Sequence, residues 1–145
     1  MGFGWIFESL DFRHRKAMTR RSDPPVVLVK WYDFTKWVLG HVDNFPKNQR
    51  FVFGQRLADG VLGILELIVD ATYSDKKSKI LLEVNRRLEV LRWLLRLAFD
   101  RRLLASKQYA YSSEQLTECG RMIGGWYKQA VAKEGSIDEA SQGAI

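Results

Sequence analysis

Proline, the residue that most strongly stops a helix, occurs only at Pro24, Pro25 and Pro46 of this 145-residue chain. The chain after Pro46 contains none, so no residue there forbids a long helix. Apolar residues also recur every three or four positions, which is the spacing of one helix face. The sequence therefore predicts an all-α fold, and its length fits one domain with one hydrophobic core.

Short turn signals divide the chain into four helical segments. The first follows the Pro24-Pro25 pair, and the last is expected to begin at Ser112, which has capping-box spacing to Gln115. Four helices joined by turns of about six residues pack most simply as an up-down-up-down antiparallel four-helix bundle. The expected segments span residues 26–42, 47–73, 79–104 and 112–133.

Glycines and chain ends interrupt this pattern. Within the second segment, Gly54, Gly60 and Gly63 are expected to let another backbone come close. Residues 1–25 are basic and irregular, and residues 134–145 are small, polar and unpatterned. We predict a flexible N-terminal extension over 1–25, a bundle over 26–133 and a flexible C-terminal tail over 134–145.

The composition favours a soluble cytoplasmic protein with no membrane association. No apolar run reaches the roughly 18 residues that a membrane span needs. At the N-terminus, basic residues follow the apolar ones, which is the wrong order for a signal peptide. The single cysteine, Cys119, cannot form an intrachain disulfide, so a reducing compartment is the expected location.

Sequence signatures of catalysis are missing. There is no Glu-x-x-His pair for a di-iron bundle, no arginine four to six residues before His14 or His41 as in helical ribonucleases, and no phosphate-binding glycine loop. Glu66 and Asp70 could be a metal or acid-base pair, but a solvated or salt-bridged face is the favoured interpretation. Cys119 could be a reactive thiol, yet packing filler is favoured. We expect no catalytic residue, metal or cofactor.

The segment "NRRLEVLRWLLRLAFDRR" (85–102) combines many leucines with six arginines. On a helical wheel it belongs to a helix with two apolar stripes. The stripe assigned to the bundle core comprises Ile80, Val84, Leu88, Leu91, Leu94, Leu95 and Ala98. The opposite stripe, called the second stripe below, comprises Leu82, Val90, Trp93 and Leu97. It is interleaved with the basic residues Lys79, Arg86, Arg92 and Arg96.

One bundle core can bury only one of these stripes. A row of four large apolar residues is unlike the single exposed apolar side chains of ordinary surfaces. Self-association is the favoured interpretation, which makes the second stripe an oligomer interface. A different protein partner and simple exposure are the alternatives.

Positive charge gathers in the same part of the chain. Residues 75–111 hold ten basic and four acidic side chains, a balance equal to the net charge of +6 of the whole chain. A solvated face with Glu83–Arg87 and Glu89–Arg92 pairs is one interpretation. However, such faces usually balance their signs, and the guanidinium fork suits phosphate. The sequence favours binding of RNA or DNA through backbone phosphates, tolerant of sequence and weakened by salt.

Much of the chain resembles a known family. The similar stretches are "KWYDFTKWVLGHVDNFPKNQRFVFGQRL" (30–57), "LELIVDATYS" (65–74), "LRWLLRLAFDRRLLASKQYAYSS" (91–113) and "GRMIGGWYK" (120–128). They resemble Avd, the accessory variability determinant of diversity-generating retroelements, a four-helix-bundle family related to proteins encoded in intervening sequences of ribosomal RNA genes. The resemblance covers about residues 26–131.

This resemblance implies a homopentameric barrel that binds a reverse transcriptase and nucleic acid. The enzyme copies a template RNA with errors at adenines, and the mutated cDNA diversifies a target gene; the accessory protein has no catalytic residues. The residues matched to the family's basic surface are Arg86, Arg87, Arg92, Arg96, Arg101 and Arg102, to which the wheel adds Lys79. The alternative function is a ribosome- or RNA-associated structural bundle with no retroelement role. A cryptic nuclease, a third possibility, predicts metal-dependent cleavage of RNA.

Overall fold

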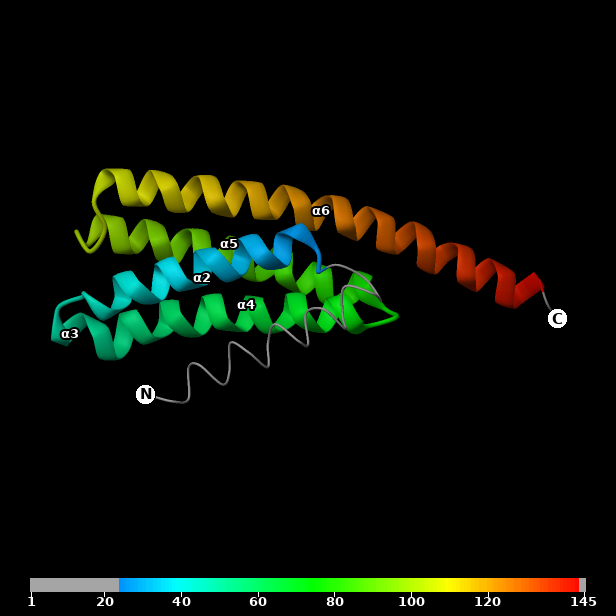
Figure 1. Cartoon of the computed structure of the whole chain (residues 1–145), viewed down its shortest axis with the longest axis horizontal. Helices are drawn as coiled ribbons and strands as arrows, with labels where there is room; N and C mark the ends of the chain where they lie inside the picture. Colours follow the sequence, from blue (N-terminus) through cyan, green and yellow to red (C-terminus); the bar gives the residue numbers. More distant parts are fainter. Residues whose placement is uncertain (1–23, 144–145) are drawn as a thin grey trace, which may run out of the picture.

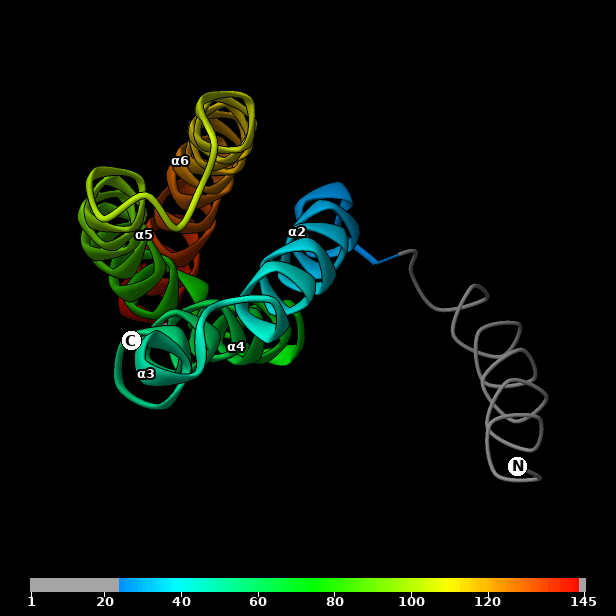
Figure 2. The same cartoon turned by 90° about the vertical axis from the view of Figure 1, so that its left-hand side faces the viewer.

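The structure is a computed structural model that describes residues 24–143. Within this range the chain is all-helical, without strands, and forms four long helices. Successive helices run in opposite directions (Figure 1), and in an end-on view they surround one centre (Figure 2). This confirms the predicted all-α, up-down-up-down four-helix bundle. Its elements are α2 (Val26–Asp43), α3 (Lys47–Gln49), the π-helical turn η1 (Arg50–Gly54), α4 (Gln55–Tyr73), α5 (Lys77–Asp100) and α6 (Ser106–Gly143).

The core is built around Trp31 of α2. Its side chain is fully buried, packs on Phe34 with ring centroids 5.2 Å apart, and donates a hydrogen bond from Nε1 to the Val61 carbonyl oxygen at 2.9 Å. The hydrogen bond satisfies the one polar atom of the indole, so the ring can be buried without an unpaired donor. Below it, α4 contributes Leu57, Val61, Ile64 and Ile68 at helical spacing. Trp31 therefore joins α2 to α4.

The second helix spans Lys47 to Tyr73 as predicted, but its backbone widens into the turn η1 near the start. Gly54 closes this turn and is buried against the preceding chain reversal. A Cβ there would lie 3.0 Å from Val42 Cγ1 and 3.4 Å from Phe45 Cδ2. A Cβ at Gly60 or Gly63 would meet only the side chain of Leu91 or Arg87, so the prediction that these two glycines admit another backbone is wrong. At Gly54 the nearest atoms are the side chains of Val42 and Phe45, followed by the Gln49 backbone oxygen at 3.5 Å.

The turn between α5 and α6 has the hydrogen bonds of a Schellman motif. The Arg102 amide donates to the Phe99 carbonyl oxygen and the Leu103 amide to that of Ala98, each at 2.9 Å. Arg102 occupies the left-handed position of the motif, with φ of 63°. This ends α5 at Asp100, four residues before the predicted boundary.

The predicted start of the last helix at Ser112 is wrong, because α6 begins at Ser106. Ser112 lies inside the helix, fully buried, and its Oγ donates to the Tyr109 carbonyl oxygen. Gln108 caps the true start, since its Oε1 accepts a hydrogen bond from the Ala105 amide at 2.8 Å.

The predicted end near Lys133 is also wrong, because α6 continues to Gly143. Glu134 of α6 lies beside the start of α5, where its carboxylate accepts hydrogen bonds from the amide and hydroxyl of Ser78. These bonds lower the pKa of Glu134 below its ordinary value, the hydroxyl's bond having the largest effect. Flexibility of 134–145 stays a prediction. Most of the predicted extension over 1–25 lies outside the described residues.

On α5 the core stripe is largely as predicted. The buried residues include Leu81, which the wheel did not assign, while Ile80 and Leu94 are only partly buried at the edge. The remaining five predicted core residues of α5 are buried: Val84, Leu88, Leu91, Leu95 and Ala98. This face points into the bundle, so the opposite face of α5 is the one available to a partner.

Candidate nucleic-acid and subunit interface

The second stripe is exposed in the single chain. Trp93 has 74% of its surface accessible, and the other three residues have between 44% and 52%. Because the core stripe of α5 already fills its side of the bundle core, these side chains have no place inside the subunit. The stripe comprises Leu82, Val90, Trp93 and Leu97. Its exposure is the condition that a subunit interface requires.

Four of the six predicted arginines form ion pairs with acids of their own helix. Arg86 Nη2 lies 2.6 Å from Glu83 Oε1, and Arg87 Nε lies 3.0 Å from the same oxygen. The hydrogen bonds from Arg86 and then Arg87 lower the pKa of Glu83 to about 2. Farther along, Arg92 pairs with Glu89. Exposed pairs of this kind contribute about 0–1 kcal/mol, so a phosphate could compete for these guanidinium groups.

The arginines do not form one continuous row. Arg87 reaches the seam between α5 and α4, where its Nη1 would lie 2.8 Å from a Cβ at Gly63. Arg92 turns to the opposite seam, where its Nη1 donates to Thr117 Oγ1 of α6 at 3.2 Å. Lys79 is exposed near the start of α5, roughly six turns from Arg101. The predicted site is thus divided into separate basic areas.

One basic area lies at the end of the bundle where α5 meets α6. Antiparallel topology brings the α2–α3 turn to the same end (Figure 1). Arg101 Nη2 donates to Gln49 Oε1 at 2.9 Å, which joins the two turns. We call this area the basic end; its exposed residues are Lys47, Arg50, Arg101, Arg102 and Lys107. Arg96 pairs with Asp100 at 3.3 Å and lies about one turn before the end of α5, farther from the end of the bundle.

Sequence reasoning missed Lys47 and Arg50 because they belong to a stretch, residues 26–74, with balanced charge. The signal that could have found them is topological. In an up-down-up-down bundle the first and third turns lie at the same end, so the basic residues of both turns add to one field.

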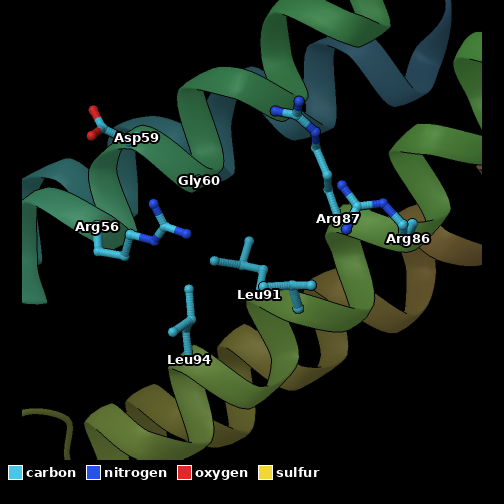
Figure 3. Close-up of a pocket in the computed structure, with 8 residues that line it drawn as sticks. Arg56, Asp59, Gly60, Arg86, Arg87, Leu91 and Leu94 are labelled. Carbon is cyan, nitrogen blue, oxygen red and sulfur yellow. The ribbon is translucent and has the colours of Figure 1, made fainter.

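A second basic area is a groove of about 350 Å³ between α4 and α5. Figure 3 shows Arg56 reaching across from α4 toward Leu91 and Leu94, and Arg87 reaching from α5 toward α4. The carboxylate of Asp59 points away from the groove. Arg56 was not among the predicted residues, because it lies far from the arginine-rich segment in sequence.

Other candidate sites carry no support for chemistry. Burial raises the pKa of the Cys119 thiol to about 11, so the side chain is protonated at neutral pH and packs as a core residue. Glu66 and Asp70 are both exposed. Residues 24–143 contain no cluster of three or more histidine, cysteine or acidic side chains that could hold a metal ion. No helix in that range has the length and apolarity to cross a membrane.

Comparison with known proteins identifies one similarity. A family model described as bAvd-like matches residues 26–130, which cover the bundle from the start of α2 into α6. No curated protein and no solved structure matches the chain.

Proposed function

The chain belongs to the bAvd-like family, and from this premise we propose that it is a non-catalytic accessory subunit of a diversity-generating retroelement. In this role it binds the reverse transcriptase together with template RNA or cDNA and supports mutagenic reverse transcription. The protein supplies a binding surface and leaves the chemistry to the enzyme.

The basic end is the observation that carries the nucleic-acid part of this proposal. Five exposed lysine and arginine side chains from two turns share one end of the bundle. Their heads lie at the surface, where phosphate oxygens can replace water and neighbouring carboxylates. Arg102 adds a further argument, because it holds a left-handed backbone position that glycine or asparagine would occupy more readily. A strained arginine retained at such a position is consistent with a binding role.

The exposed second stripe supports the assembly part. A bundle that pairs this stripe with another subunit repeats its basic end in every copy, so a modest local charge becomes an extended field. Five copies, the number implied by the Avd resemblance, is the assembly we propose.

A charge-reversal pair tests nucleic-acid binding. Arg96→Glu with Arg102→Glu reverses the charge of one residue of the basic end and of the neighbouring Arg96 while leaving the core of α5 intact. We expect RNA affinity to fall at least about tenfold and its salt dependence to weaken, because fewer counterions are released. Fluorescence anisotropy with labelled RNA over a salt series measures both quantities.

The matched control is a charge-reversal pair that lies away from the basic end. Lys36→Glu with Lys128→Glu changes the charge equally on exposed positions of α2 and α6 and should preserve more of the affinity. Unchanged binding by a folded Arg96→Glu, Arg102→Glu protein would refute this assignment.

The non-catalytic role and the retroelement role need separate tests. Pure protein incubated with RNA and Mg²⁺ or Mn²⁺ should leave the RNA intact, and metal-dependent cleavage would contradict the proposal. A reverse-transcriptase gene with paired variable and template repeats should lie near the gene for this chain. Their absence would favour the ribosome- or RNA-associated structural role.

A further inference from the structure

The groove between α4 and α5 is separate from the basic end and has a different composition. Arginines line its edge, with Arg56 on one helix and Arg86 and Arg87 on the other, while Leu91 and Leu94 contribute an apolar wall. Asp59, Gly60 and Val90 complete the lining, so the groove borders the second stripe at Val90. Its volume of about 350 Å³ lies within the range of small-ligand pockets. Cationic groups above an apolar wall complement a ligand that has a phosphate at one end and an apolar face at the other.

We propose that this groove binds one nucleotide of a single-stranded nucleic acid, with its phosphate on Arg56 and Arg87 and its base against the leucine wall. The inference rests on the proposed nucleic-acid contact and assigns Arg56 a role in it. A duplex keeps its bases stacked and paired inside the helix, so only an unpaired strand can present a base face to such a wall.

The positions of the guanidinium groups support this assignment. Glu83 accepts from Arg87 Nε, which leaves the terminal amino groups of Arg87 extending past it toward α4. Gly63 makes room for them, because its missing Cβ would stand 2.8 Å from Arg87 Nη1. Arg86 is held differently, since Glu83 takes both its Nε and its Nη2. Arg87 and Arg56 are therefore the side chains directed into the groove from opposite helices.

Gly63→Ala tests the groove without changing the charge of the protein. The added methyl group meets the far end of a flexible side chain, so Arg87 must move while the α4 backbone can stay. Alanine also favours a helix more than glycine does, so thermal stability should not fall. Gly40→Ala is the matched control, because a Cβ at Gly40 has no heavy atom within 4 Å.

The probe is a fluorescein-labelled single-stranded RNA of about 12 nucleotides, a length suited to one extended binding surface. We expect Gly63→Ala and Arg56→Gln each to weaken binding about threefold to tenfold, and Arg56→Gln to reduce the slope of log K against log salt by about 0.7. Gly40→Ala should bind as the wild type does. Duplex RNA of the same sequence should be insensitive to Gly63→Ala.

Unchanged single-strand affinity in both groove variants, with wild-type binding intact, would overturn the groove and leave the proposed function standing. An equal loss for duplex RNA would also overturn it. Absence of wild-type binding at low salt would overturn the proposed nucleic-acid contact itself. A second readout is independent of the oligonucleotide: adenosine monophosphate should shift the amide resonances of Gly60 and Gly63, whereas shifts confined to the basic end would refute the groove.

Discussion

The second stripe makes a quantitative prediction about Trp93. A tryptophan side chain can bury about 150–250 Å², and 74% of Trp93 is exposed in the single chain. Covering this surface in a subunit interface would therefore bury about 150 Å² per copy. At about 25 cal/mol per Å², that burial corresponds to an upper estimate of about 4 kcal/mol.

Trp93→Ala should accordingly weaken subunit association by about two to three orders of magnitude, since each 1.4 kcal/mol is a factor of about ten. The bundle itself should remain folded, because the substituted side chain lies outside the core. Size-exclusion chromatography with light scattering over a dilution series measures the mass. The wild type should hold a multiple of the 16.8 kDa subunit mass at concentrations where the variant falls to that value.

Tyr73→Ala is the matched control for this experiment. Tyr73 is a similarly exposed aromatic residue, with 65% of its surface accessible, but it ends α4 and is not part of the second stripe. It should leave the oligomer mass unchanged. An unaltered dissociation midpoint in Trp93→Ala, or equal dissociation in both variants, would refute the assignment of the interface to this stripe.

Three further predictions concern stability and reactivity. Arg102→Gly removes a left-handed backbone cost of about 1 kcal/mol and should raise the melting temperature by about 3–6 °C while weakening RNA binding; a lower melting temperature contradicts the Schellman assignment. Glu134 has a lowered pKa, so its contribution is present above the ordinary glutamate pKa and lost as pH falls through the lowered one. The melting-temperature advantage of wild type over Glu134→Gln should shrink between about pH 6 and pH 3, and a constant difference contradicts it. Cys119 should react with a water-soluble thiol reagent only after unfolding, and rapid reaction of the native protein contradicts its burial.

Periodicity predicted the helices well because their core faces obey simple spacing. The scarcity of proline and the recurring apolar residues placed α2 and the segment from Lys47 to Tyr73 almost at their observed bounds. The same pattern could not reveal the turn η1, because a π turn changes the number of residues between hydrogen-bonded groups without changing which residues are apolar.

Helix boundaries failed where tertiary contacts replace local signals. Ser112 has capping-box spacing, yet burial inside the bundle and the cap from Gln108 determine the actual start of α6. The continuation beyond Lys133 accompanies the contact of Glu134 with the start of α5. A residue 56 positions away along the chain makes that contact, so no local window contains it.

The candidate surfaces show the same limit. Trp93 could be singled out from the helical wheel, because both stripes belong to one helix. Arg56 could not, because the groove exists only after α4 packs beside α5. Nor does an arginine-rich sequence say that Arg87 and Arg92 turn to opposite seams, which depends on space beside Gly63 and on Thr117.

The accessory role is tested most directly by cDNA synthesis with the reverse transcriptase whose gene the proposal expects near the gene for this chain. Template RNA and the enzyme are incubated with and without the purified protein, and full-length cDNA is quantified. The proposed function predicts that cDNA forms efficiently only when the protein is present and that the protein elutes with the enzyme and RNA. Equal cDNA yield without it, together with separate elution, would contradict the proposal.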